Sequence, residues 1–183
     1  MKYINRIEDF LEKRKDNVND YNCVMIYLNI SNWDKIQENI DEDDLYIDIN
    51  DDSYGREDNP HITLIYGIHD IPDSEISNDL RNININDIKF KGVSVFNNDK
   101  FDVLKFDIDS NEMVSYNTLF VSKYPNTNDY TYHPHCTIAY LKPGKSDKYV
   151  DMINKDIQFK IEGVVYSKID GSKKYYNINN NIS

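Results

Sequence analysis

The sequence predicts an α+β fold built from antiparallel strands and short helices. Three observations support this prediction. Apolar runs of strand length recur along the chain, stretches with helical spacing of apolar residues separate them, and the turns at 97–99 and 170–171 are typical of β-hairpins. The 183 residues suit a single domain, residues 1–183, with enough core to fold alone.

The first forty residues are predicted to form a helix, a strand and a second helix. Residues 3–17 combine helical spacing of apolar residues with a charged opposite face. Asn22–Ile30 reads as an apolar strand, and Ser31 is expected to cap a short helix over residues 32–40. The side chains of this helix that we expect to face inward are Trp33 and Ile36.

The acidic stretch 41–52 is predicted to be an exposed loop. Its alternating acidic residues partly match a calcium-binding EF-hand loop. Ser53 and Asn59, however, stand where such a loop needs Gly and Glu, so we reject a calcium site.

The middle of the chain is predicted to hold two helices on either side of a β-hairpin. The first helix follows Pro72, the strands cover residues 88–96 and 101–108, and the second helix covers residues 110–124. The residues expected to face inward are Ile76 and Leu80 in the first helix and Met113, Leu119 and Phe120 in the second.

The last part of the chain is predicted to form a short helix and a final hairpin. An apolar strand stops at Lys142-Pro143-Gly144, and Ser146 begins a short helix that runs through Ile153. Strands over residues 158–168 and 173–178 then pair around the turn at Asp170-Gly171.

Two strand segments, 60–66 and 134–140, carry nearly the same residues. They read PHITLIY and PHCTIAY, so each contains Pro, His, any residue, Thr and an apolar residue. Residues two apart on a strand point to the same face. Each segment therefore offers one imidazole and one hydroxyl on the same face, and the four residues are His61 with Thr63 and His135 with Thr137.

Two histidines and two threonines facing one groove can cleave a phosphodiester without a metal. One imidazole takes a proton from the attacking oxygen and the other protonates the leaving oxygen, because the pKa of histidine lies near neutrality. The threonine hydroxyls can donate hydrogen bonds to the non-bridging oxygens as charge develops on them. The sequence therefore predicts that His61, His135, Thr63 and Thr137 are catalytic and that no cofactor is needed.

The motifs His61-Ile62-Thr63-Leu64 and His135-Cys136-Thr137-Ile138 resemble the two H-x-[ST]-h motifs of the 2H phosphoesterase superfamily. The resemblance implies a bilobal fold in which two antiparallel sheets with pseudo-twofold symmetry surround a central groove, with helices outside. It also implies a metal-independent phosphodiesterase. Family substrates include 2',3'-cyclic phosphates, 2'-5'-linked oligonucleotides and RNA ends. One phage branch degrades the cyclic oligonucleotide signals of bacterial anti-phage (CBASS) immunity.

Two other interpretations of the histidines are weighed against this one. A buried imidazole can be structural, but a structural role does not explain why both motifs have Thr at the same offset. A zinc site could use His133, His135 and a third ligand such as His61. The sequence has no further zinc motif, so we expect no metal, and we expect His69 and His133 to be loop residues.

The residues at odd offsets in the two motif segments are expected on the opposite face, in the core. They include Tyr66, Tyr140 and Cys136, and Cys136 is therefore a poor candidate for a nucleophile. Cys23 and Cys136 give no disulfide signal, so we expect a reducing cytoplasm, which is the host cytoplasm if the protein is phage-encoded. No apolar stretch is long enough to cross a bilayer, and no signal region follows the start.

The formal net charge of −11 disfavours binding to long duplex nucleic acid, because such binding depends on Lys and Arg. A small nucleotide is the expected partner, and no membrane or obligate protein partner is indicated. Residues 142–183 form a basic tail, so a lysine there, such as Lys142, is expected to receive a phosphate near the second motif. For contact with a base we expect Tyr27, on the first strand, and Tyr132, just before the second motif.

Three functional hypotheses follow from the sequence. The first is hydrolysis of a cyclic oligonucleotide immune signal, by which a virus evades immunity. The second is an RNA-end enzyme that acts on 2',3'-cyclic phosphates or 2'-5' linkages. The third is a module that sequesters a nucleotide without cleaving it.

Overall fold

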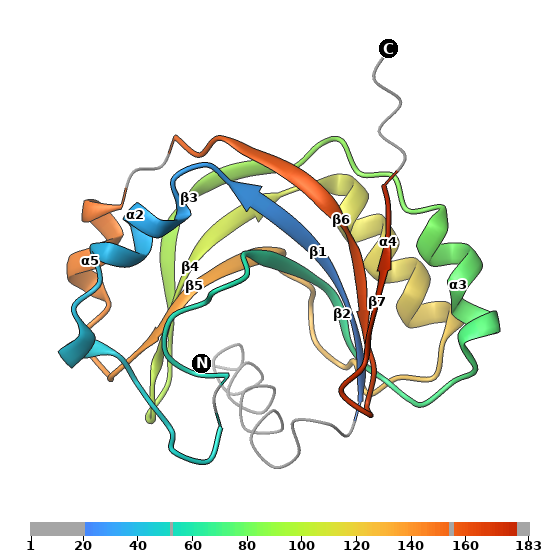
Figure 1. The fold of residues 1–183 in the computed structure, drawn as a ribbon, viewed down its shortest axis with the longest axis horizontal. Coiled ribbons are helices and arrows are strands. Elements are labelled where there is room, and N and C mark those ends of the chain that lie inside the picture. The colour runs from blue at the N-terminus through green and yellow to red at the C-terminus, as the bar shows by residue number, and fades with distance from the viewer. Residues whose placement is uncertain (1–20, 52, 154–155, 179–183) are drawn as a thin grey trace.

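The computed structural model describes residues 21–51, 53–153 and 156–178. Seven strands form one curved sheet in the order β3-β4-β5-β2-β1-β6-β7, and every pair of neighbouring strands is antiparallel (Figure 1). The α+β class is thereby confirmed. The helix predicted over residues 3–17 lies outside the described residues.

The strands lie close to their predicted positions. Their bounds are Asn22–Ile30 (β1), His61–Ile68 (β2), Lys89–Asn97 (β3), Asp102–Asp109 (β4), His135–Leu141 (β5), Phe159–Ser167 (β6) and Lys173–Tyr176 (β7). The sequence pattern of apolar residues bounded by turn residues predicted these positions correctly, because local pattern determines where a strand begins and ends.

The helices are short and also match the predictions in position. They are Trp33–Glu38 (α2), Asp73–Arg81 (α3), Asn111–Lys123 (α4) and Asp147–Met152 (α5), with a single 3₁₀ turn at Glu42–Asp44 (η1). The side chain of Ser110 caps α4 by accepting a hydrogen bond from the backbone N–H of Met113. None of the helices in this part of the chain combines the length and hydropathy of a membrane-spanning segment.

Three details of the sequence prediction are wrong. Ser31 does not cap α2, because the residue before that helix is Asn32, whose side chain makes no capping bond. Leu119 is 45% exposed instead of facing the core. The acidic stretch 41–52 is only partly exposed, since Asp44 and Leu45 are buried and Leu45 bridges to Leu141 of β5.

The order of elements repeats once along the chain. A β-α-β-α-β unit runs from β1 to β3, and a second runs from β4 to β6. The third strand of each unit pairs with the other unit, since β3 lies beside β4 and β6 beside β1. The sheet therefore consists of two halves, β3-β4-β5 and β2-β1-β6-β7, which mirror one another in strand order except for the extra β7.

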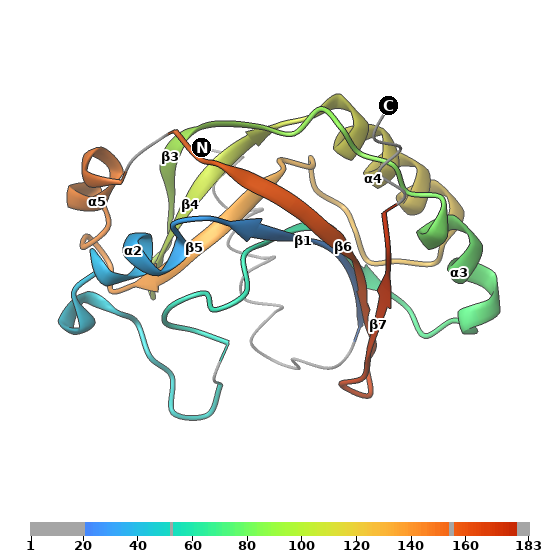
Figure 2. The same ribbon diagram turned by 45° about the horizontal axis from the view of Figure 1, so that its top comes forward.

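The two sheets expected from the sequence are these halves, joined as one sheet. The junction between β2 and β5 has a single register pair, Ile62 with Cys136. Helices α2 and α5 lie beside one end of the sheet, and α3 and α4 beside the other (Figures 1 and 2).

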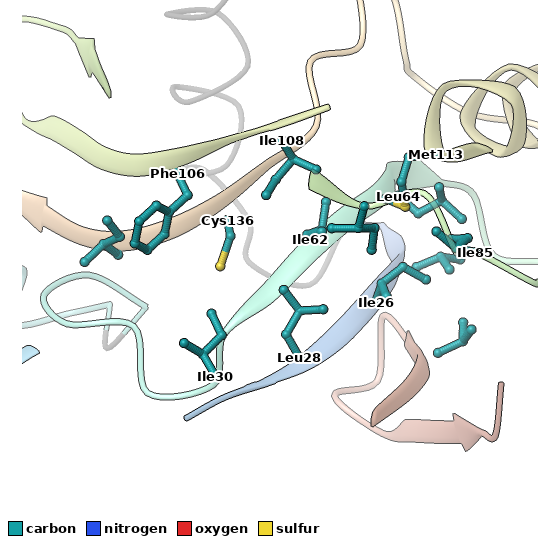
Figure 3. Close-up of a cluster of buried hydrophobic side chains, with 14 of the residues drawn as sticks. Ile26, Leu28, Ile30, Ile62, Leu64, Ile85, Phe106, Ile108, Met113 and Cys136 are labelled. Atoms are coloured by element: carbon teal, nitrogen blue, oxygen red, sulfur yellow. The ribbon is translucent and has the colours of Figure 1, made fainter. Parts of the chain in front are cut away.

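The hydrophobic core lies between one face of the sheet and the helices. Ile62, Leu64 and Cys136 point into it from the motif strands, and they meet Ile26 of β1 and Met113 of α4 (Figure 3). All five side chains are fully buried. Because side chains alternate along a strand, burial of one set directs the intervening residues to the opposite face of the sheet.

Candidate active site

The two motif strands are neighbours at the centre of the sheet. β2 and β5 pair antiparallel at Ile62 and Cys136, whose side chains are buried in the core. The residues before and after each of these two alternate to the opposite face. The four side chains that share this face, which we call the motif face, are those of His61, Thr63, His135 and Thr137.

The register places each histidine beside the threonine of the other motif. With Ile62 opposite Cys136, the next antiparallel positions set His61 against Thr137 and Thr63 against His135. In such pairs, Cβ atoms of opposed residues lie about 4.5–5.5 Å apart and diagonal neighbours lie about 7–8 Å apart. The two imidazoles are diagonal neighbours, and a phosphoryl group with its attacking and leaving oxygens can span that distance.

Each imidazole is oriented by a backbone carbonyl two residues upstream. Nδ1 of His61 lies 2.8 Å from the carbonyl oxygen of Asn59, and Nδ1 of His135 lies 2.9 Å from that of His133. Because a carbonyl oxygen only accepts hydrogen bonds, Nδ1 carries the hydrogen in both rings. The lone pair of each neutral ring is therefore on Nε2, which is the atom able to exchange a proton with a substrate.

Aromatic residues surround the first motif. Tyr27, a predicted substrate contact, pairs with His61 across β1 and β2, and their ring centroids are 5.8 Å apart. Nζ of Lys173 donates to the Tyr27 hydroxyl over 3.2 Å, and the Tyr175 ring meets the Tyr27 ring edge-on at 6.3 Å. A carboxylate oxygen of Glu57 lies 3.9 Å from Nδ1 of His61.

Charged residues surround the second motif. On β4, Asp107 pairs with His135 and Lys105 pairs with Thr137. The Lys105 side chain is only 4% exposed, and Nζ donates to Oγ of Ser94 over 2.7 Å and to a carboxylate oxygen of Asp107. A buried ammonium group thus lies on the motif face in the row of residues that contains Thr137.

The ring of Phe96 connects this lysine with the second imidazole. Nζ of Lys105 lies 4.0 Å from the centre of the ring, and the His135 ring meets it edge-on at 5.3 Å. Sequence reasoning missed Lys105. The available signal was a lysine inside a buried apolar strand, two residues before Asp107 and therefore on the same face.

Both motif strands contain a β-bulge at the apolar residue after the threonine. The pairing of β2 with β1 skips Leu64, and the pairing of β5 with β4 skips Ile138. A side-chain amide from a helix holds each bulge: Asn117 of α4 donates to the Leu64 carbonyl over 2.8 Å, and Gln37 of α2 donates to the Ile138 carbonyl over 2.9 Å. Each helix therefore supports the motif strand of the other repeat.

These bulges overturn one prediction about the tyrosines. An extra residue reverses the alternation of side chains, so Tyr66 pairs with Cys23 and Tyr140 pairs with Val103 on the motif face. The prediction that both tyrosines lie on the core face is wrong. Tyr140 packs instead in a small separate cluster that contains Tyr54, Phe101 and Val103.

The other two predicted substrate contacts have structural partners. The Tyr132 hydroxyl donates to the Thr63 carbonyl over 2.8 Å, and its ring packs against the core, where burial raises the pKa of Tyr132 well above its ordinary value. Lys142 follows the last residue of β5, seven residues beyond His135, about 23 Å away at the usual strand rise. Its Nζ donates to the Asp43 carbonyl over 2.6 Å, so its position does not support a role beside the second motif.

Most other lysines of the basic tail pair with carboxylates away from the motifs. Lys145 and Lys148 contact Asp44, and Lys168 and Lys174 contact Asp73. Lys173 differs, because it reaches Tyr27 on the motif face.

The cysteines and remaining histidines lie where the sequence placed them. Cys136 is fully buried in the core, where desolvation raises the pKa of its thiol, and neither cysteine forms a disulfide. His69 and His133 lie outside the strands and are exposed. Among the described residues, no group of three or more His, Cys, Asp and Glu side chains is arranged to hold a metal ion.

Two comparisons with known proteins bear on the family and the fold of this chain. Residues 31–173 match the family model of the 2'-5' RNA ligase superfamily. The fold is similar to that of Usb1 from Kluyveromyces marxianus, solved with uridine monophosphate, with a TM-score of 0.55 and 10% identity over 87% of this chain and 99% of that chain. No curated protein sequence matches the chain.

Proposed function

Because this chain belongs to the 2'-5' RNA ligase superfamily of 2H phosphoesterases, we propose that it is a phosphodiesterase that hydrolyses a small nucleotide. The observation that carries the proposal is the arrangement of two imidazole–hydroxyl pairs around the register pair Ile62–Cys136. One motif alone would supply a single proton donor or acceptor. Two motifs on one face supply both partners of an acid–base reaction.

On this proposal, Nε2 of one imidazole takes the proton of an attacking hydroxyl, from water or a ribose. The attacking oxygen forms a bond to phosphorus, and the bond from phosphorus to the leaving oxygen breaks. Nε2 of the other, protonated imidazole donates its proton to that leaving oxygen. Either histidine, His61 or His135, can be the base, since Nδ1 of each ring donates to a backbone carbonyl and leaves Nε2 to exchange the proton.

The threonine hydroxyls are assigned to the phosphoryl group. Thr63 and Thr137 lie on the same face as the imidazoles, each opposite the histidine of the other motif. Donation from a hydroxyl to a non-bridging oxygen strengthens as negative charge develops on that oxygen, which lowers the barrier. Tyr27, whose ring lies beside that of His61, is assigned to stack on a nucleobase.

The net charge of −11 favours a small nucleotide over long nucleic acid. The narrower form of the proposal is a cyclic oligonucleotide immune signal, and its basis is the resemblance of the two motifs to a phage branch of the superfamily. The alternative is an RNA-end substrate. Usb1, the fold neighbour, was solved with uridine monophosphate, which favours a nucleotide ligand for a sheet of this kind.

A substrate panel tests the proposal. The purified chain is incubated, with EDTA present, with cyclic di- and trinucleotides, 2'-5'-linked dinucleotides and RNA ending in a 2',3'-cyclic phosphate, and products are identified by mass spectrometry. Turnover of any member that is lost in a His61→Ala, His135→Ala double variant supports the proposal. Cleavage of RNA ends alone rejects the cyclic-oligonucleotide form, and tight binding with recovery of intact ligand rejects catalysis in favour of sequestration.

A further inference from the structure

We propose that Lys105, held by Ser94 and Asp107, forms an anion subsite on the motif face that binds a non-bridging oxygen of the substrate's phosphoryl group. The inference deepens the proposed function and rests on it. Lys105 would share the phosphoryl group with Thr137, its cross-strand neighbour.

Three contacts fix the ammonium group in this place. It donates to Ser94 and to Asp107, and it lies over the Phe96 ring, which also touches His135. An ammonium group has three N–H donors, and Ser94 and Asp107 use two of them. The side chain of Asp107 is 45% exposed, so solvent reaches the carboxylate that pairs with Lys105 although Lys105 itself is buried.

The repeated topology shows that the fold does not require a cation here. Corresponding rows of side chains cross the two halves of the sheet at the threonine of each motif. The row in the second half contains Ser94, Lys105 and Thr137, and the row in the first half contains Val165, Met25 and Thr63.

The residues opposite the two histidines also differ, with a charged residue in the second half and an uncharged one in the first. Asp107 pairs with His135, whereas the corresponding partner of His61 is Tyr27. The first half thus has apolar and aromatic side chains at the corresponding positions, and Met25 is also buried, at 8% exposed.

Burial of the Lys105 ammonium group is unfavourable for the fold. Removing a charged group from water carries a large free-energy cost, and well-packed apolar residues of similar size are often equally or more stabilising. Since Met25 fills the corresponding position in the first half, stability alone does not account for a lysine. A group that binds negative charge next to the second motif does account for it.

Binding of inorganic phosphate to the full chain, measured by calorimetry, tests the subsite directly. Lys105→Met is expected to weaken phosphate binding at least about tenfold, because a charge-assisted contact is lost, whereas Lys105→Arg retains binding. The matched control is Lys91→Met. Lys91 forms an exposed pair with Asp109 on the same two strands, 3.3 Å apart, and its loss is expected to leave phosphate affinity unchanged.

A second variant keeps the inference testable if Lys105→Met does not fold. Asp107→Asn removes the carboxylate that partly neutralises Lys105 but keeps an acceptor for its hydrogen bond, so phosphate binding is expected to become several-fold tighter. Unchanged phosphate affinity in both Lys105→Met and Asp107→Asn, or in the one of them that folds, overturns the subsite.

Turnover separates this inference from the proposed function. If the wild-type chain cleaves phosphodiesters and Lys105→Met leaves both turnover and phosphate affinity unchanged, only the subsite is rejected. If the wild-type chain cleaves no phosphodiester but loses phosphate binding with Lys105, the subsite stands and the proposed function is rejected.

Discussion

His61 and His135 share one contact, because Nδ1 of each ring donates to a carbonyl two residues upstream. Such a contact fixes the tautomer and orients the ring. A backbone carbonyl just before each strand therefore orients the imidazole, a role that a side chain has in many acid–base sites.

Replacing either imidazole tests its role most directly. His61→Ala and His135→Ala are each expected to reduce turnover at least about 100-fold, since a positioned acid or base contributes about that much. Steady-state kinetics on the substrate found in the panel measures the effect. His69→Ala is the control, because His69 is exposed beyond the end of β2, and its turnover should match the wild type. Equal activity in all three variants would reject paired-histidine catalysis.

Single residues also show how far the sequence could be interpreted. Alternation along a strand correctly predicted that Cys136 lies in the core. The same rule gave the wrong face for Tyr66 and Tyr140, because no sequence pattern predicts the bulges at Leu64 and Ile138. The catalytic roles of the histidines and threonines stay predictions.

At the level of elements, each bulge depends on a helix from the other repeat. Asn117 is buried and donates to the Leu64 carbonyl, while Gln37 donates to the Ile138 carbonyl, which also accepts the backbone N–H of Glu57 over 3.0 Å. The two amides thus occupy corresponding positions, but the carbonyl bound by Gln37 has a second hydrogen-bond donor.

This inequality predicts different costs for the two amides. Asn117→Ala is expected to lower the free energy of unfolding by about 1–3 kcal/mol, because it removes a buried donor. Gln37→Ala is expected to cost less, since Glu57 still donates to the same carbonyl. Urea unfolding of both variants measures the difference. A larger loss for Gln37→Ala would contradict the assignment.

Two glycines in corresponding strands offer a matched pair. Gly92 of β3 pairs with Asp107, and Gly163 of β6 pairs with Tyr27; neither has a positive φ. A Cβ on Gly163 would lie 2.7 Å from the carbonyl oxygen of Tyr176 in β7, whereas a Cβ on Gly92 would meet nothing within 4 Å.

Only one of these glycines should therefore tolerate alanine. Gly163→Ala is expected to destabilise the protein by about 1–3 kcal/mol, because β7 must shift away from β6. Gly92→Ala is expected to be neutral or to stabilise by up to about 1 kcal/mol, because alanine restricts the unfolded chain. Thermal unfolding of the two variants distinguishes them, and equal melting temperatures would show that β7 yields without cost.

The elements themselves were largely predictable, because their position depends on local pattern. Their pairing was not. β1 and β6 pair across a long stretch of chain, with Tyr27 opposite Gly163, and no local pattern encodes such a contact.

For the molecule as a whole, carboxylates held by lysines join distant parts of the chain. The hydrogen bond from Lys148, followed by that from the Tyr149 hydroxyl, holds the pKa of Asp44 below its ordinary value of 3.8. The hydrogen bond from Lys174 does the same for the pKa of Asp73 and outweighs the opposing effect of burial.

These lowered pKa values predict sensitivity to acid. A carboxyl group whose folded pKa is depressed stabilises the protein above its unfolded pKa of about 3.9, and this stability is lost as pH falls through the folded value. The free energy of unfolding in urea should therefore begin to fall as the pH drops below about 4 and should continue to fall toward pH 2. Asp44→Asn should lower stability at pH 7 and flatten this drop, while a drop as steep as in the wild type would contradict the role of Asp44.

The exchange of third strands between the repeats has a consequence for synthesis of the protein in the cell. As the chain leaves the ribosome, β1 and β2 emerge well before β6, the strand that completes their half. One edge of β1 must remain unpaired until residues 159–167 have been translated, and an uncovered edge invites pairing with other chains. We therefore expect this nascent chain to depend on chaperones more than a protein of equal size built from sequentially adjacent strands.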